Sequence, residues 1–182
     1  MRFADPVSGP LWQAAAAGEV VVDCRGGAAR TEVGTLRGVR GEMAVVRARD
    51  VTLSRPVRLL HPRFPLYVVP WGEGLYMVGA TMIESEDLGQ VTLRSALDLL
   101  GAAFAVSPAF AEAEIVELGA SVRPAFPDNV PRILVRGGGR VVHVNGAYRH
   151  GYLLAPVLAR VVADMLENPA HAHPLIVRAE SE

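Results

Sequence analysis

The sequence contains a single cysteine, Cys24, among its 182 residues. One cysteine cannot form an internal disulfide framework or a zinc site made only of cysteines, and such scarcity fits a reducing compartment. No apolar run approaches the ~20 residues needed to cross a bilayer, and the first residues lack the charged start and continuous apolar core of a signal peptide. The sequence therefore predicts a cytoplasmic protein without a membrane span.

Blocks of one charge are missing as well. The 18 basic and 19 acidic residues give a formal net charge of -1, and the two signs are interleaved along the chain. Because no basic patch is present, the sequence gives no indication of a nucleic-acid partner. Apolar residues make up 51% and charged residues 20%, which is a globular composition sufficient for one domain or slightly more.

Short β-branched runs separated by turn residues predict the strands. A buried strand is expected at residues 19–24, followed by a glycine turn, and further strands at residues 42–46, 57–60 and 114–122. Two hairpins are also predicted. One spans residues 64–81 around a four-residue connection, Trp71 to Gly74, and the other spans residues 132–145 around three glycines.

Two helices follow from apolar residues at helical spacing. The first is capped by Thr92, ends before Pro108 and is expected to cover the sheet with Leu93, Ala96, Leu97, Leu100 and Phe104. The second runs from about Tyr152 to Glu167, with a buried stripe of Leu154, Leu158, Val161, Val162, Met165 and Leu166. Residues from 170 onwards are predicted to be a weakly structured tail. The expected fold class is α+β, with a mostly antiparallel sheet and a covering helix.

The segment V-N-G-A-Y-R-H-G-Y-L-L-A-P, Val144 to Pro156, leaves a strand and enters the last helix through Gly146 and Gly151. Glycines permit a positive φ and the close approach of a flat or charged group. The free N–H groups of the helix favour an electron-rich acceptor, such as a phosphate, a carboxylate or the pyrimidine side of a reduced flavin. Similar junctions occur in many folds without a ligand, so spacing alone leaves both interpretations open.

Five motifs in order carry a resemblance over about residues 20 to 168. They are R-G-E-M at Arg40, H-P-R-F-P-L-Y-V-V-P at His61, M-V-G-A-T-M at Met77, R-P at Arg123 and N-G-A-Y-R-H-G-Y-L-L-A-P at Asn145. In this order they resemble the C-terminal half of the D-amino-acid oxidase group of FAD-dependent oxidoreductases. Within that group, the sequence is most similar to the glycine oxidases of thiamine biosynthesis.

The resemblance implies a molecule with an FAD-binding domain and a substrate domain built on a large antiparallel sheet. Residues 1–40 would be a remnant of the FAD-binding domain and residues 41–125 the substrate domain. Residues 126–168 would return to a truncated FAD-binding domain with its C-terminal strand and helix, and residues 169–182 would be a tail. The implied reaction is oxidation of glycine, a small D-amino acid or a secondary amine. The substrate's α-carbon gives a hydride to FAD, the imine hydrolyses, and oxygen reoxidises the flavin to yield hydrogen peroxide.

The same resemblance assigns roles to individual residues, and no acid–base catalyst is among them. Arg123 would bind the substrate carboxylate, Tyr67 and Met82 would line the pocket, and Arg149 would lie beside both pocket and flavin. The residues expected to contact the flavin are Gly146, Arg149, His150, Gly151, Tyr152 and Leu153. From the residues alone, Arg123 could equally be a solvated strand-end arginine, and Tyr67 and Met82 could be core residues. His171 and His173 have no third ligand nearby in the sequence, so no metal site is predicted.

One family motif is absent, since G-x-G-x-x-G, the turn that holds the FAD pyrophosphate, does not occur in the sequence. Met1 aligns with the middle of the family pattern. We therefore expect a truncated reading frame, a second chain that supplies the missing half, or a segment that has drifted to another use. The alternative function is a non-catalytic α+β module that acts by protein–protein association. The expected protein partners are a second copy of the chain, in a homo-oligomer, or a complementing FAD-domain chain. The missing segment is also expected to leave apolar surface exposed around Leu154, Leu158 and Val161.

Overall fold

The computed structural model describes residue 11, residues 18–60 and residues 66–178. Residues 61–65, which begin one predicted motif and the first hairpin, lie outside the described residues. The chain divides into two compact units. Unit 1 consists of Met1–Arg37 and Arg123–Glu182, and unit 2 consists of Gly38–Val122.

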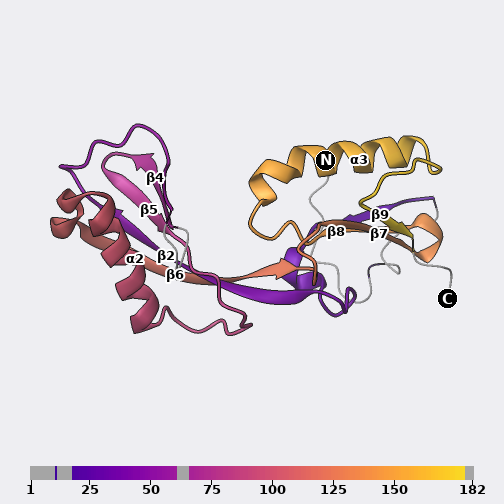
Figure 1. Cartoon of the computed structure of the whole chain (residues 1–182). Coiled ribbons are helices and arrows are strands. Elements are labelled where there is room, and N and C mark those ends of the chain that lie inside the picture. Colours follow the sequence, from indigo (N-terminus) through magenta and orange to yellow (C-terminus); the bar gives the residue numbers. More distant parts are fainter. Residues whose placement is uncertain (1–10, 12–17, 61–65, 179–182) are drawn as a thin grey trace. The chain divides into compact units, whose positions relative to one another are not determined.

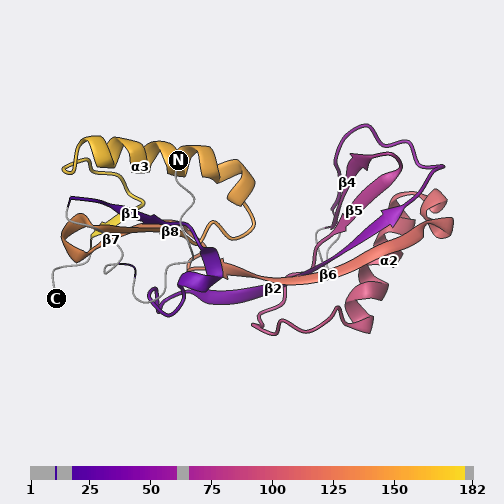
Figure 2. The same cartoon turned by 180° about the vertical axis from the view of Figure 1, so that it is seen from behind.

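Unit 2 is built on a five-stranded sheet in the order β3-β4-β5-β2-β6 (Figures 1 and 2). Its strands are β2 (Arg37–Arg47), β3 (Val57–Leu59), β4 (Leu66–Gly72), β5 (Leu75–Gly79) and β6 (Glu114–Ala125). Strand β4 pairs antiparallel with both β3 and β5, and β5 pairs antiparallel with β2. The predicted hairpin and the predicted strand at residues 114–122 therefore share one mostly antiparallel sheet, which confirms the α+β class.

The turn between β4 and β5 is tighter than predicted. Strand β4 continues to Gly72 after an irregularity at Pro70, so only Glu73 and Gly74 form the connection. Their φ angles are 53° and 74°, and two-residue turns with positive φ match the twist of the strands that they join. The predicted four-residue connection was wrong because its first two residues extend the strand.

Helix α2 (Leu93–Val106) packs on the unit 2 sheet and begins at the predicted cap, where the Thr92 hydroxyl accepts the Ser95 N–H at 3.2 Å. The buried side of the helix differs from the prediction. Its buried residues are Ser95, Leu99, Ala102 and Ala103, whereas Leu93 and Leu97 are 77% and 64% exposed. Helical spacing fits more than one face of an alanine-rich helix, and the face with small residues is the one that packs on the sheet.

The core of unit 2 lies between α2 and the sheet. Leu99 and Ala103 join Leu66, Val68 and Val78 in one buried cluster. The short 3-10 helix η2 (Pro108–Glu112) closes this cluster through Phe110, whose ring meets that of Tyr76 edge to face at 5.4 Å. The Tyr76 hydroxyl donates to the Val51 carbonyl, so its polar end is satisfied while its ring is buried.

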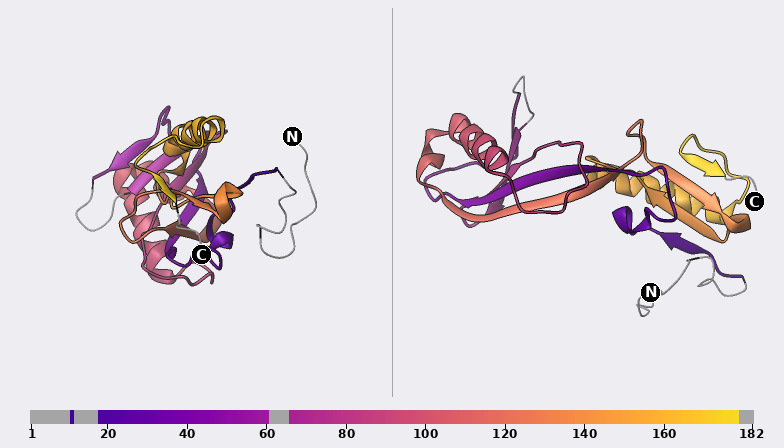
Figure 3. Two further views of the ribbon diagram at one scale, coloured as in Figure 1. Left: turned by 90° about the vertical axis from the view of Figure 1, so that its right-hand side faces the viewer. Right: turned by 90° about the horizontal axis from the view of Figure 1, so that it is seen from below.

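Unit 1 contains a four-stranded sheet in the order β1-β8-β7-β9 (Figure 3). Its strands are β1 (Val21–Asp23), β7 (Arg132–Arg136), β8 (Val141–Asn145) and β9 (Ile176–Arg178). Strands β7 and β8 form the second predicted hairpin around η3 (Gly137–Gly139), while β1 runs parallel to β8 and β9 runs parallel to β7.

Two expectations for this sheet were wrong. The predicted weakly structured tail contains β9, because Ile176 packs with the cluster under the last helix and pairs with β7. The strand predicted to be buried at residues 19–24 is the edge strand β1, in which Val22 is 41% exposed and Asp23 is buried. A β-branched run predicts a strand but does not show whether that strand has neighbours on both sides.

Helix α3 (Gly151–Glu167) covers one face of the unit 1 sheet (Figure 1). Its buried residues Leu158, Val161, Val162 and Met165 pack on Ile133 and Val142. On the opposite face, Ala29, Val33, Leu36 and Phe126 pack with Leu134 beside the 3-10 helix η1 (Gly26–Ala29). The alternation of Ile133 and Leu134 between the two faces follows the pleat of β7.

Two further expectations, both about which residues of α3 are exposed, were wrong. Leu166, predicted to be buried, is 44% exposed. The exposed apolar surface was expected around Leu154, Leu158 and Val161, but Leu158 and Val161 are core residues. Exposed apolar side chains instead belong to Tyr152, Leu153 and Val157.

The orientation of α2 can be tested by two truncations at nearby positions. Leu99→Ala should lower the free energy of unfolding by about 2–5 kcal/mol, because it opens a cavity in a packed core. Leu97→Ala should change it by less than about 0.5 kcal/mol, because that side chain is largely exposed. Urea unfolding of both variants measures the difference, and a larger loss for Leu97→Ala would contradict the described face.

Candidate functional site

The parallel strands β1 and β8 end at the same edge of the unit 1 sheet. The chain leaves β1 through Cys24, Arg25 and Gly26, and it leaves β8 through the loop at residues 146–150. In sheets with parallel strands, ligands bind beyond the carboxyl ends of those strands. The turn after β1 and the loop after β8 are therefore the candidate site.

A polar network fixes the turn after β1. The Asp23 carboxylate accepts the Arg25 backbone N–H at 3.0 Å and the Arg25 Nε–H at 2.8 Å. Arg25 also donates from Nη2 to Glu32 Oε1 at 2.6 Å, and His143 Nδ1 lies 2.7 Å from Asp23 Oδ2. Asp23 and His143 are both buried, so the interaction anchors the turn to β8 from within the unit.

The charge of Asp23 is favoured by these contacts. Burial is the largest single effect and raises the pKa of the carboxyl group, but it is outweighed by several others. Hydrogen bonds from the Arg25 side chain and backbone and from His143, with the Arg25 charge, lower the pKa from 3.8 to about 2. In turn, the hydrogen bonds of Arg25 to Asp23 and, next in size, to Glu32 raise the pKa of the Arg25 guanidinium. Burial and the neighbouring Asp23 raise the pKa of the Cys24 thiol.

A second set of contacts joins the turn to the loop after β8. Asn145 Nδ2 donates to the Gly26 carbonyl at 2.8 Å, and Asn145 Oδ1 accepts the Gly146 N–H at 2.8 Å. Pro124 lies beside the same turn, since its Cγ would be 3.6 Å from a Cβ placed on Gly26. The predicted Arg123-Pro124 motif at the end of β6 therefore packs next to the carboxyl end of β1.

Gly146 has a positive φ, and the group that approaches it closely is a side chain of the same unit. Its φ is 76°, as expected of a glycine that allows close approach. The approaching group is the Phe126 ring, whose Cδ2 would lie 2.2 Å from a Cβ on Gly146. Gly151 does not use this freedom, since its φ is not positive and it begins α3.

The remaining residues predicted to contact the flavin lie at the start of α3. Arg149 is half-buried, and His150 is exposed and precedes the helix without a side-chain cap. Tyr152 and Leu153 are 101% and 76% exposed. The first N–H groups of a helix have no acceptor within it, so this end of α3 presents donors beside two exposed apolar side chains.

Tyr67 and Met82 belong to unit 2, whereas Arg123 and Arg149 belong to unit 1. Tyr67 is half-buried on β4, and its hydroxyl would lie 3.0 Å from a Cβ on its cross-strand neighbour Gly79. The missing side chain of Gly79 thus makes room for the Tyr67 ring. Met82 follows β5 and is 42% exposed, so it is not one of the core residues.

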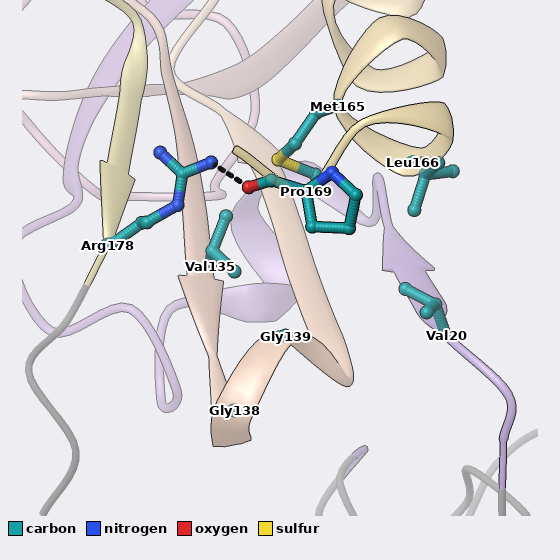
Figure 4. Close-up of a pocket in the computed structure, with 8 residues that line it drawn as sticks. All are labelled: Val20, Val135, Gly138, Gly139, Met165, Leu166, Pro169 and Arg178. Carbon is teal, nitrogen blue, oxygen red and sulfur yellow. Dashed lines mark hydrogen bonds between the residues drawn. The ribbon is translucent and has the colours of Figure 1, made fainter. Parts of the chain in front are cut away.

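A pocket of about 410 Å³ lies within unit 1, at the end of its sheet where η3 joins β7 to β8 (Figure 4). It is lined by Val20, Val135, Gly138, Gly139, Met165, Leu166, Pro169 and Arg178. Arg178 donates across its rim to the Pro169 carbonyl at 2.8 Å. None of the predicted site residues lines this pocket.

Among residues 11, 18–60 and 66–178, no group of three His, Cys, Asp or Glu side chains could hold a metal ion. His171 stacks on His173, whose Nδ1 accepts the Leu175 N–H at 3.2 Å in the turn before β9. Within the same part of the chain, no helix combines the length and apolarity required for a membrane span.

The family is decided by a sequence comparison. A family model described as FAD dependent oxidoreductase, DAO, matches residues 4–165. The chain belongs to this family. A protein of Rhizobium etli that carries the name of a thiamine biosynthesis oxidoreductase, ThiO, is 58% identical to this DAO-family chain over 80% of the chain and 44% of its own length.

Solved structures show the same fold. The chain superposes on the glycine oxidase of Bacillus cereus with a TM-score of 0.73 and 27% identity, over 86% of the chain and 44% of that structure. For the glycine oxidase of Geobacillus kaustophilus, the TM-score is 0.71 and the identity 27%, over 86% and 43%. The chain thus spans less than half the length of these relatives.

FAD is the cofactor of this family. Among the described residues, the first N–H groups of α3 are donors that suit its electron-rich ring, whereas Gly146 packs against Phe126 and donates its N–H to Asn145. The G-x-G-x-x-G turn that binds the diphosphate occurs nowhere in the sequence. The start of α3 therefore fits the ring side of FAD, and the sequence has no diphosphate turn.

Several residues of the site were not found from the sequence. Three of them are polar residues within apolar strands, namely Asp23, His143 and Asn145. A polar residue in such a strand indicates a buried polar group, and a buried polar group requires a partner. Arg40 and Glu42 were noted only as letters of a motif, yet both are buried in unit 2. Which partners they meet could not be read without the strand pairing.

The Gly146 turn can be tested by a matched pair of substitutions. Gly146→Ala should lower the free energy of unfolding by more than about 1–2 kcal/mol, since the left-handed conformation alone costs that much and the Cβ overlaps Phe126. Gly151→Ala should have no cost or stabilise by up to about 1 kcal/mol, because alanine favours helices. Equal losses in urea unfolding would contradict the described loop.

The Asp23 network predicts a pH dependence of stability. The folded-state pKa of about 2 lies below the ordinary value of 3.8, so ionised Asp23 stabilises the fold above about pH 4 and this stabilisation is lost as the pH falls towards 2. Asp23→Asn should flatten that part of the stability profile, whereas the exposed Asp50→Asn should not. Chemical unfolding between pH 6 and pH 2 measures both, and parallel profiles for wild type and Asp23→Asn would contradict the assignment.

Proposed function

We propose that the chain supplies the substrate sheet and the ring-side part of the FAD-binding domain of an amine oxidase. The substrate is glycine, a small D-amino acid or a small secondary amine. Residues 1–40 and 126–168 belong to the FAD-binding domain, residues 41–125 belong to the substrate domain, and residues 169–182 form the tail. Family membership and the glycine oxidase relatives support this assignment, and the observation that carries it is Arg123-Pro124 beside the turn after β1.

Arg123 binds the substrate carboxylate in this proposal. A guanidinium group can hold a carboxylate through two parallel hydrogen bonds, which fixes the orientation of the α-carbon. Arg123 is half-buried on β6, and Pro124 after it is packed against the Gly26 turn. A side chain anchored in this way loses less freedom when it binds a ligand than one on a loose loop.

Tyr67 and Met82 contribute the apolar walls around the substrate. Both lie on or beside the hairpin of β4 and β5, and both retain exposed surface. A rigid hairpin can define the volume open to a methyl or ethyl group, and such volumes distinguish glycine from its larger analogues by about 1–3 kcal/mol.

Gly146, Arg149 and residues 150–153 hold the ring of the flavin. When bound, FAD would supply a hydride acceptor for the α-carbon of the amine. The residues of the chain would have to place the substrate and to provide donors for the electron-rich ring. The donors at the start of α3 suit the second task, and Arg149 adds a positive charge beside them.

A second candidate function is association without catalysis. Exposed apolar residues on α3, Tyr152, Leu153 and Val157, favour a protein partner, because soluble chains rarely leave such residues together in water. The partner would be a second copy of the chain or another protein that covers this surface.

The test uses a chimera in which the N-terminal half of the Rhizobium etli relative precedes this chain. We expect the chimera to bind FAD and to produce peroxide from glycine or a related amine. Arg123→Ala should reduce kcat/KM by about ten- to a hundredfold, the effect of losing one or two charge-assisted hydrogen bonds. The exposed Arg94→Ala on α2 is the matched control and should leave kcat/KM unchanged.

The outcomes separate the two functions. The 182-residue chain by itself is the baseline, and fluorescence titration should show only weak FAD binding because no diphosphate turn is present. A chimera that binds FAD but oxidises none of the amines would leave association as the supported function. An unchanged kcat/KM for Arg123→Ala would refute the role of this arginine.

A further inference from the structure

Two oppositely charged side chains are buried side by side on β2. Arg40 and Glu42 are 2% and 0% exposed, and as residues two apart on a strand they share one face of the sheet. Arg40 donates to Glu42 Oε1 from Nε at 3.0 Å and from Nη2 at 2.8 Å. Such a pair seldom stabilises a fold more than apolar residues of similar size would, so its contacts with the rest of the unit are informative.

Arg40 holds the irregular segment between β5 and α2. Its Nη2 donates to the Gln90 carbonyl at 2.6 Å, and its Nη1 donates to the Asp87 carbonyl at 2.5 Å. The Asp87 carboxylate lies 3.7 Å from Nη1 and is largely exposed. One guanidinium group therefore satisfies two backbone carbonyls in the part of the segment that follows its bridge to β2 at Ile83.

Glu42 holds both ends of the same segment. At the far end, its Oε1 accepts the Thr92 N–H at 3.2 Å, directly before α2. At the near end, its backbone N–H donates to Thr81 Oγ1 at 2.8 Å, and the Thr81 hydroxyl donates to Glu42 Oε2 at 3.3 Å. Burial is the largest effect on the Glu42 carboxyl and opposes its charge, yet hydrogen bonds from Ser95, Arg40 and Thr92 lower its pKa.

Met82 lies between two residues that β2 holds in place. On one side, the Thr81 N–H donates to the Glu42 carbonyl at 3.1 Å. On the other side, Ile83 and Arg40 exchange two backbone hydrogen bonds of 3.0 and 2.8 Å. The backbone on either side of Met82 is thus fixed by the two residues that form the buried ion pair, while the Met82 side chain remains 42% exposed.

We propose that Arg40 and Glu42 are positioning residues that fix Met82 as a wall of the substrate site. This inference rests on the proposed function for the role of Met82, and on the contacts above for the positioning itself. The pair touches neither substrate nor cofactor. It acts through Thr81 and through the segment that leads to α2, so that weakening it shifts Met82 without changing the chemistry of any group at the site.

The first measurement needs neither FAD nor substrate. The sequence has five methionines, so methyl-labelled methionine gives an NMR spectrum with few signals. The signal of Met82 reports on the segment between β5 and α2. Met77 on β5 and Met165 on α3 serve as internal controls. Thr81→Val removes the hydroxyl between the two strands and keeps the buried charges paired, and Glu42→Gln keeps the shape and removes the negative charge.

Both variants should shift or broaden the Met82 methyl signal while the Met77 and Met165 signals stay in place. The exposed Glu112→Gln is the matched control for the loss of a carboxylate and should leave all of them unchanged. If Glu42→Gln does not fold, Thr81→Val decides the question, because it leaves no buried charge unpaired. An unmoved Met82 signal in a folded Thr81→Val variant would overturn the inference, as would equal shifts at all methionines.

The second measurement uses the chimera described above. Thr81→Val should lower kcat/KM for the amine substrate by about ten- to a hundredfold, the order of loss expected when a site residue is displaced by about an ångström. The absorbance of bound FAD should be unchanged, since the flavin contacts lie in unit 1. A Met82 signal that moves without any change in kcat/KM would show that Met82 is positioned but does not line the site, which refutes its assigned role.

Discussion

The parallel pairing of β1 with β8 is the constraint on which the candidate site depends. It brings Asp23 to within hydrogen-bond distance of His143, 120 positions later in the chain. Because both strands run in the same direction, the turn after β1 and the loop after β8 leave the sheet at one edge. Asn145 then bridges these two connections through the Gly26 carbonyl and the Gly146 N–H. Without the pairing, the glycines of the site would belong to unrelated loops.

Each unit places charged groups inside an apolar layer and uses them to hold irregular backbone. In unit 1, Asp23 fixes the turn after its own strand through the Arg25 backbone and side chain. In unit 2, Glu42 and Arg40 fix the segment between β5 and α2. A buried charge is costly unless it is fully paired, so each arrangement tolerates little change. Both irregular segments gain a defined conformation in this way without adding strands or helices.

The sequence predicted the elements well and their surroundings less well. The two hairpins, the cap at Thr92 and the extents of α2 and α3 follow from local periodicity and turn chemistry, which act over a few residues. The buried face of α2 could not be predicted, because Leu97 and Leu99 are equally apolar and only the sheet distinguishes them. Strand β9 was missed for a similar reason, since three residues carry little propensity and its stability comes from pairing with β7.

The site shows the same division between local and distant information. Gly146 was found because a glycine after a strand is a local signal, whereas its contact with Phe126 joins residues that only the fold brings together. The roles of Tyr67, Met82, Arg123 and Arg149 came from resemblance, and no local rule separates them from ordinary surface or core residues. The partners of Asp23, Arg40 and Glu42 depend on strand pairing, and the sequence shows only that such buried groups require partners.

Helix α3 carries apolar residues on two of its sides. The helix buries Leu158, Val161 and Val162 against its own sheet, yet Tyr152, Leu153 and Val157 on its other side are also apolar. Apolar residues on two sides of a helix are typical of a helix that is covered by other elements on both of these sides. Strand β1 repeats the pattern, since Val22 is exposed on a strand of the parallel type that is normally enclosed. Among the described residues of unit 1, exposed apolar side chains therefore lie along both α3 and β1.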